Sequence, residues 1–135
     1  MKVYIVTQTF PPKIGGMQIL MSSIADGLSK LNFDVNVFPD HYYYNNNCNF
    51  KVYNFFAPKI IRPLIKKTNI YFRSIGNEIF ICDSWKSVSS VPKTKSKIIC
   101  FALAQELFVR EQKNIKIQRA FNRCNRIIPI SNFTY

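Results

Sequence analysis

The chain has 135 residues, which suits one domain with its own core and is short for two. Hydrophobic residues make up 47% of the sequence, with 12 Phe and 7 Tyr, and this excludes a chain that is disordered throughout. The formal net charge of +12 lies entirely after residue 50. It favours polyanionic partners such as anionic lipid headgroups, nucleotide phosphates or nucleic acid, although a compositional bias toward Lys, Asn and Ile gives the same surplus.

The amino terminus carries neither a secretory signal nor a membrane-spanning run, because Gln8 soon ends the apolar residues that follow Lys2. We therefore expect a cytoplasmic chain, at most attached peripherally to the inner face of a membrane. The four cysteines are widely separated and form no C-x-x-C pair, which predicts reduced, partly buried thiols. Because His41 is the single histidine and lies far from the cysteines in sequence, we do not expect a histidine-rich metal site. We also expect no cofactor.

The first part of the chain predicts a strand, a glycine loop, a helix and a second strand. Residues 3–9 form a β-branched run before two prolines, which is typical of a buried parallel strand. The loop 10–16 leads into residues 17–31, whose apolar positions recur at three- and four-residue spacing and predict a helix that Asn32 ends. Residues 33–38 alternate apolar and polar side chains, as a second strand does.

The rest of the chain predicts four more strands and two more helices. The expected strands are residues 50–56, 78–82, 97–102 and 126–131, and the expected helices are residues 59–73 and about 111–125. After residue 83 we expect only a Ser-rich connection. The whole order indicates one α/β domain over residues 1–135, with a Rossmann-like, mostly parallel sheet and helices on both of its faces.

Both later helices have an apolar face and a basic face. In the later of the two, about residues 111–125, the apolar side carries Ile117, Ala120, Phe121 and Cys124, and the basic side carries Lys116, Arg119, Arg123 and Arg126. In residues 59–73 the apolar face carries Ile60, Ile61, Leu64, Ile65, Tyr71 and Phe72, and the basic face carries Lys59, Arg62, Lys66 and Arg73. We expect both helices to bury their apolar faces on the sheet and to leave their basic residues in water. The alternative is that a basic face holds the protein on an anionic membrane surface.

The loop Pro11-Pro12-Lys13-Ile14-Gly15-Gly16 indicates a binding site. It matches neither the Walker A pattern nor the spaced glycines of a dinucleotide fingerprint, which argues against an ordinary ATPase or NAD enzyme. Gly15 and Gly16 could let the backbone approach a diphosphate, with helix N–H groups as donors, or they could merely permit a tight turn. The place of the loop at the carboxyl end of a parallel strand favours binding.

Three segments in the right order resemble the amino-terminal domain of family 4-type glycosyltransferases. They are Phe10-Pro11-Pro12 with Gly15-Gly16, Asp26-Gly27-Leu28 followed by Phe33-Asp34-Val35-Asn36-Val37, and Asn125-Arg126-Ile127-Ile128-Pro129-Ile130-Ser131-Asn132-Phe133-Thr134. The resemblance spans the chain and implies half of a GT-B architecture, in which two Rossmann-like domains face each other. Such enzymes transfer a sugar from a nucleotide-sugar donor to a glycan or lipid-linked acceptor, usually with retention and without a required metal.

The resemblance implies a role for the glycine loop in holding the donor. Gly15 and Gly16 would face the diphosphate of the nucleotide sugar. Lys13 beside them would add charge that stabilises the leaving nucleoside diphosphate. The alternative for Lys13 is a solvated loop lysine, since lysines are mostly exposed.

The resemblance fails at one position of the sugar site. Where the family often has His-Gly-x-Glu at the end of the fifth strand, this chain has Leu103-Ala104-Gln105-Glu106, so Leu103 replaces the histidine. Gln105, Glu106 and Ser131 are the acceptor-side candidates. Glu106 could instead begin a helix, where a negative charge is favourable.

The sequence stops at Tyr135, before the donor-binding second domain that family members have. We therefore expect a poor catalyst on its own, whether the chain is a fragment, a truncated remnant or one half of a split enzyme. The alternative function, which Leu103 favours, is a noncatalytic Rossmann-like module that binds an anionic ligand or a partner domain. We expect no nucleic-acid partner, because helix-turn-helix, zinc-finger and RNA-recognition signatures are absent from the sequence.

Overall fold

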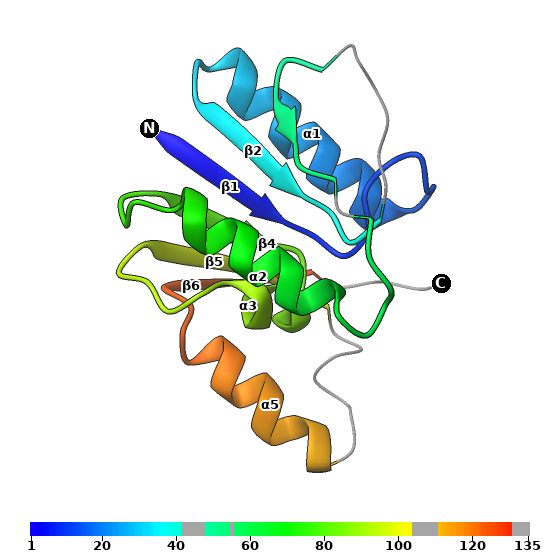
Figure 1. Ribbon diagram of the computed structural model, residues 1–135, viewed down its shortest axis with the longest axis vertical. Helices are drawn as coiled ribbons and strands as arrows, with labels where there is room; N and C mark the ends of the chain where they lie inside the picture. Colours follow the sequence, from blue (N-terminus) through cyan, green and yellow to red (C-terminus); the bar gives the residue numbers. More distant parts are fainter. Residues whose placement is uncertain (42–47, 55, 104–110, 131–135) are drawn as a thin grey trace.

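The sheet contains six parallel strands in the order β3-β2-β1-β4-β5-β6, with helices on both of its faces (Figure 1). The computed structural model describes residues 1–41, 48–54, 56–103 and 111–130. The strands are β1 (Lys2–Val6), β2 (Asp34–Phe38), β3 (Lys51–Val52), β4 (Ile79–Cys82), β5 (Lys97–Leu103) and β6 (Arg126–Ile130). This confirms the predicted Rossmann-like α/β fold, and each pair of neighbouring strands in the described residues is parallel.

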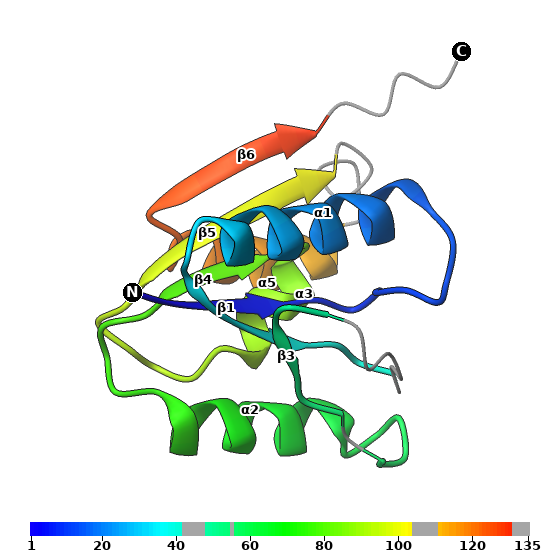
Figure 2. The same ribbon diagram turned by 90° about the horizontal axis from the view of Figure 1, so that it is seen from above.

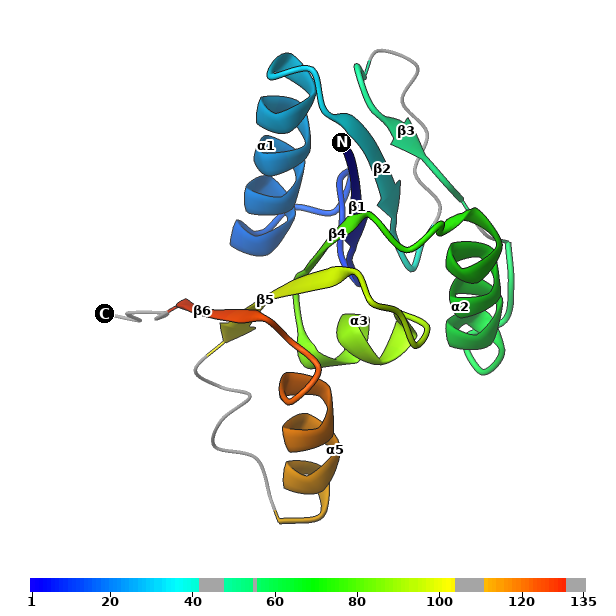
Figure 3. The same cartoon turned by 90° about the vertical axis from the view of Figure 1, so that its left-hand side faces the viewer.

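The described helices are α1 (Gly16–Lys30), α2 (Arg62–Arg73), α3 (Trp85–Ser90) and α5 (Glu111–Phe121). Helix α1 lies on one face of the sheet and α2 on the other (Figure 2, Figure 3). Successive residues of β1 point to opposite faces, so Tyr4 shares a core with Ile70 of α2, and Ile5 shares a core with Met21 of α1. Because β1 is covered on both faces, the four residues that follow Lys2 in this strand form a continuous buried run.

Asn32 ends α1, as the sequence predicted. Its backbone is in the left-handed region, with φ of 65°, a conformation that asparagine tolerates better than most residues. The next residue, Phe33, donates its N–H to the carbonyl oxygen of Leu28 at 3.1 Å. This bond across the left-handed residue closes the last turn of the helix and directs the chain into β2.

Helix α2 turns its apolar side outward and buries Lys66, the reverse of our expectation for both, whereas Lys59 and Arg73 are exposed as expected. Lys66 and Ile70 are fully buried, whereas Leu64, Tyr71 and Phe72 are 67%, 63% and 79% exposed. The sequence separated the two faces of this helix correctly, with Pro63 in its first turn. The prediction that the apolar face packs on the sheet is wrong.

Lys66 faces the sheet because fixed partners lie beneath it. The Lys66 ammonium donates to the Asp40 carboxylate at 2.6 Å and to the Thr7 carbonyl oxygen at 2.8 Å. The Arg73 guanidinium lies 4.1 Å from the centre of the Tyr53 ring, within the range of a cation–π contact. A buried charge is tolerated when it is paired and hydrogen-bonded, and Lys66 is both.

A tyrosine of the central strand fastens the carboxyl end of α2. The Tyr4 hydroxyl donates to the Arg73 carbonyl oxygen at 2.7 Å. Burial, followed by the nearby Glu78 carboxylate, raises the pKa of Tyr4 to about 12. The phenol therefore stays neutral and keeps its donor hydrogen for one of the last carbonyl groups of the helix, which have no partner within it.

Helix α3 occupies the segment expected to be a Ser-rich connection. Ser84 caps its amino end by accepting the N–H of Ser87 at 3.4 Å. Arg123, expected to point into water, instead donates to the carbonyl oxygens of Val88 and Val91 at 3.0 and 2.8 Å. This arginine, two residues beyond α5, therefore ties that end of the chain to the carboxyl end of α3.

The other elements follow the prediction with shifted ends. Helix α5 buries Ile117 and Ala120 and exposes Lys116 and Arg119 as expected, but it ends at Phe121. The third strand is only the two residues of β3. The four cysteines are free thiols, two buried and two half-buried, as predicted. None of the described helices is long and apolar enough to cross a membrane.

Candidate functional site

The candidate site lies at the carboxyl edge of the sheet, between β1 and β4. From β1 the chain passes to α1 on one face, and from β4 it passes to α3, which packs in the core of the other face. Loops that leave neighbouring parallel strands toward opposite faces open a crevice between them. Ligands of doubly wound α/β folds bind at this point of the sheet.

Asp83 joins the ends of β1 and β4. Its buried carboxylate accepts the Thr7 hydroxyl at 2.6 Å and the Gln8 amide at 2.8 Å on one oxygen. The other oxygen accepts the hydroxyls of Ser84 and Ser87. Because the protein's own donors occupy both oxygens, Asp83 holds the strand ends in place rather than acting as a base.

Lys66 brings a positive charge to the same edge from α2. Its ammonium group is buried and donates to the Asp40 carboxylate and to the Thr7 carbonyl oxygen. Asp40 follows β2 and its side chain is 30% exposed. The pair therefore connects the ends of β1 and β2 to α2 and leaves part of its carboxylate facing the solvent.

A cavity of about 240 Å³ opens beside these groups. Its walls include Gln8, Asp40, Lys66, Trp85, Lys86 and Ser90. The volume is below the roughly 300–1,000 Å³ of pockets for drug-sized ligands, so it suits one small polar fragment. Amide, hydroxyl and carboxylate groups can hydrogen-bond sugar hydroxyls, and the half-buried indole offers an apolar surface to a sugar ring.

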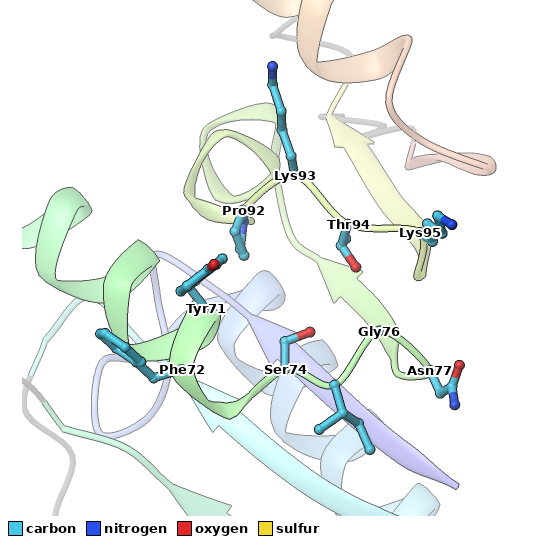
Figure 4. A pocket seen from close by; sticks show the side chains of 10 residues that line it. Tyr71, Phe72, Ser74, Gly76, Asn77, Pro92, Lys93, Thr94 and Lys95 are labelled. Atoms are coloured by element: carbon cyan, nitrogen blue, oxygen red, sulfur yellow. The ribbon is translucent and has the colours of Figure 1, made fainter.

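A larger hollow of about 550 Å³ lies at the opposite edge of the sheet (Figure 4). It is bordered by Gly76 and Asn77, which precede β4, and by Thr94 and Lys95, which precede β5. Ligands of parallel α/β sheets bind at the carboxyl edge. The smaller cavity is therefore the better candidate for a substrate site despite its size.

Gly15 and Gly16 lie where the loop after β1 enters α1. Gly15 has an extended backbone, with φ of 170°, which any residue can adopt. Among the described glycines, Gly76, with φ of 93°, is the one in the range that favours glycine. A Cβ atom added at Gly16 would meet no atom within 4 Å, and one at Gly15 would meet the flexible end of Gln18. Neither turn geometry nor crowding within the described protein requires glycine at these positions.

The loop also presents free donors and a charge. No described side chain caps the amino end of α1, so the first amides of the helix point toward the loop without a side-chain acceptor. Lys13 is exposed in this loop. His41 lies after β2, and its Nε2 atom is 2.7 Å from the Phe10 carbonyl oxygen. The histidine therefore holds the start of the loop.

The three acceptor-side candidates, Gln105, Glu106 and Ser131, lie outside the described residues. Leu103 is the last residue of β5 and pairs in register with Ile130 of β6. It lies at the carboxyl edge, where the resemblance would place a histidine. Within the described residues, no group of three or more His, Cys, Asp or Glu side chains could hold a metal ion.

Sequence reasoning missed Asp83, Lys66 and Asp40. The sequence did contain a signal for the two aspartates, because each stands one or two residues after an apolar strand. The carboxyl ends of parallel strands meet at one edge of the sheet, where ligands bind. No comparable signal existed for Lys66, which lies in mid-helix among other lysines and arginines. The sequence as a whole matches no protein-family model and no curated protein, so the geometry carries the interpretation.

Proposed function

We propose that this chain is the acceptor-side half of a GT-B glycosyltransferase of the family 4 type, working in the cytoplasm. It would help to transfer a sugar from a nucleotide-sugar donor to a glycan or lipid-linked acceptor. The six-stranded parallel sheet and the cavity at its carboxyl edge support this proposal. The resemblance in the glycine loop and in the β2 and β6 segments gives it its specific direction.

The observation that carries the proposal is the open space at Gly16. Glycine lowers helix stability relative to alanine, and here neither its backbone conformation nor its neighbours call for it. A ligand that approaches the backbone closely gives glycine a purpose at this position. A diphosphate is such a ligand, because its oxygens accept the unpaired N–H groups at the start of a helix.

In this proposal the loop stabilises the charge that leaves during transfer. As the bond between the sugar and the diphosphate breaks, negative charge grows on the nucleoside diphosphate. The amides at the start of α1 and the Lys13 ammonium would hydrogen-bond and neutralise that charge. The cavity beside Gln8 and Trp85 would hold a sugar ring, and a second domain would supply the remaining donor contacts.

A noncatalytic binding module is the second candidate. Leu103 favours it, because an apolar side chain at the end of β5 cannot donate to or accept from a sugar hydroxyl. The same loop would then bind a diphosphate or another anion without turnover. The two candidates therefore share the binding site and differ in whether sugar is released or transferred.

The proposal is tested by calorimetric titration of the chain with a nucleoside diphosphate, the nucleoside monophosphate and the nucleoside. We expect weak binding of the diphosphate, on the order of millimolar, because one domain supplies only part of the site. Gly16→Val should weaken that binding at least about tenfold by filling the space at the helix start. Gly27→Val is the matched control, since Gly27 is also an exposed glycine of α1 with open space around it.

The results can overturn the assignment of the loop and can separate the transferase from the binding module. Equal binding by both valine variants contradicts the assignment of the loop. If the loop assignment holds, nucleotide sugars are then incubated with the chain and with a full two-domain protein that contains it. Sugar release or transfer in the two-domain protein supports the transferase, whereas binding without either supports the module.

A further inference from the structure

The outward surface of α2 is apolar although nothing in the described structure covers it. The exposed residues Ile60, Ile61, Leu64, Tyr71, Phe72 and Ile75 define what we call the α2 face. They lie within the helix or in the residues directly before and after it. Exposed apolar residues that occur singly need no explanation, but a continuous patch of them marks an interaction site.

Helical geometry places Leu64, Tyr71 and Phe72 on one side of α2. Leu64 and Tyr71 are seven residues apart, so they lie above one another along the helix, and Phe72 lies beside Tyr71. Lys66 and Ile70 point to the opposite side, where they are fully buried. The apolar residues therefore cannot turn inward without withdrawing Lys66 from Asp40 and from the Thr7 carbonyl oxygen.

Lysines border the α2 face, and the chain segments that form this border carry no acidic residue. Lys59, which precedes α2, and Lys67, within it, are both exposed. Lys93 and Lys95 lie across the hollow from Tyr71 and Phe72 (Figure 4). Residues 54–77 and 84–103 contain no Asp or Glu. The charge that complements this border is therefore negative.

One acidic residue, Glu78, follows the first of these segments and lies beside the hollow. Its side chain is turned inward. Glu78 is buried, and it accepts hydrogen bonds from the amides of Ile75 and Gly76 and the hydroxyls of Ser74 and Ser96. Its charge is thus engaged by the two loops that border the hollow. The hollow itself joins aromatic side chains from α2 to the lysines of the loop before β5.

We propose that the α2 face docks on the surface of an anionic lipid bilayer. Apolar and aromatic side chains enter the boundary between headgroups and acyl chains, while lysines beside them bind lipid phosphates. A protein partner would need a surface that is both apolar and uniformly acidic, whereas an anionic bilayer supplies both properties at once. The inference does not depend on sugar transfer, since it rests on α2 and not on the carboxyl-edge site.

The experiment is sedimentation of the full chain with lipid vesicles. We expect it to bind phosphatidylcholine vesicles that contain about one-third phosphatidylglycerol and not pure phosphatidylcholine vesicles, with binding that falls as salt rises. The double variant Leu64→Ser/Phe72→Ser should bind at least about tenfold more weakly. Both side chains are exposed, so the variant should keep the fold, which circular dichroism and thermal unfolding verify.

Matched variants on α1 control for each kind of change. Ile19→Ser removes an apolar side chain that is 60% exposed, close to the 67% of Leu64, and should leave binding unchanged. Lys67→Glu should weaken binding by about tenfold, while Lys30→Glu changes the net charge equally and should have a much smaller effect. Helix α1 lies on the opposite face of the sheet from α2 (Figure 2).

Several results would overturn the proposal. If the Leu64→Ser/Phe72→Ser variant still binds vesicles as the unaltered chain does, the α2 face is not the binding surface. If Lys30→Glu and Lys67→Glu weaken vesicle binding equally, binding depends on net charge and not on the lysines that border the α2 face. If the unaltered chain does not bind the anionic vesicles, an anionic bilayer is not the partner of the α2 face. A dimer that the double variant abolishes, without vesicle binding, would assign the face to a second copy of the chain instead.

Discussion

Two lysine–aspartate pairs in this protein have the same length and different surroundings. Lys66 lies 2.6 Å from Asp40, and Lys30 lies 2.6 Å from Asp26. The Lys66 side chain is fully buried, whereas the Lys30 and Asp26 side chains are 67% and 46% exposed. Water replaces a lost partner at the surface but not in the core, so removing the two aspartates should have different consequences.

We predict that Asp40→Ala lowers the free energy of unfolding by about 3 kcal/mol, because it leaves a buried ammonium without its counter-ion. Asp26→Ala, which breaks a surface pair of equal length, should lower it by less than about 0.5 kcal/mol. Urea unfolding of both variants measures the difference. Equal effects would show that Lys66 does not depend on Asp40 for its place in the core.

The site residues found from sequence are those with a local signature. Gly15, Gly16 and Lys13 stand in a short loop between a strand and a helix, and this pattern alone directs attention to them. Lys66 acquires its importance from Asp40, which lies on another element 26 positions earlier. Such a pairing depends on how the elements pack, so a scan for local motifs does not reveal it.

At the scale of elements, the periodicity of α2 predicted a helix and its two faces but not which face meets the sheet. The spacing of apolar residues along the sequence gives only their relative positions around the helix axis. The choice of face was made by partners elsewhere: Asp40 for Lys66 and the Tyr53 ring for Arg73. In α5, by contrast, the apolar face packs inward as the pattern indicated.

Helix α3 was missed for a different reason. It has only six residues, too few for an apolar period to repeat, and three of them are serines. Serine competes with helix formation by hydrogen-bonding to nearby backbone groups. The available signal was Ser84, a residue type that favours the position before a helix.

Glu78 links two loops at the amino edge of the sheet. Burial raises the pKa of Glu78, but hydrogen bonds from the Ile75 amide and the Ser74 and Ser96 hydroxyls outweigh it and hold the pKa below its ordinary value. The folded state therefore favours the charged carboxylate. The resulting stability is present above the pKa of the unfolded chain, near 4.5, and is lost as the pH falls through the lower value of the folded chain.

We predict that Glu78→Gln lowers the free energy of unfolding at pH 7 by about 1–3 kcal/mol, because the neutral amide accepts these hydrogen bonds less well. The variant should also lose less stability than the unaltered chain between about pH 5 and 3. Urea unfolding over this pH range measures both effects. Parallel pH curves for the two proteins would contradict the role given to the carboxylate.

At the scale of the whole molecule, the alternation of apolar runs and helical patterns predicted the parallel sheet and its two layers. Sequence order alone fixes most of this topology, since parallel strands need crossover connections and those are right-handed. The structure adds two surfaces at opposite edges of the sheet. The carboxyl edge holds the polar cavity with the glycine loop, and the amino edge holds the hollow that adjoins the α2 face.

The measurement that tests the central claim most directly is a map of amide chemical shifts in the isotopically labelled chain during titration with a nucleoside diphosphate. Binding at the glycine loop should move the amides of Gly15, Gly16 and Met17 most, with smaller changes at Gln8. The amides around Gly76 and Lys95, at the opposite edge, should not move. Shifts centred on that opposite edge, or none at millimolar ligand, would contradict the assignment of the loop as a diphosphate site.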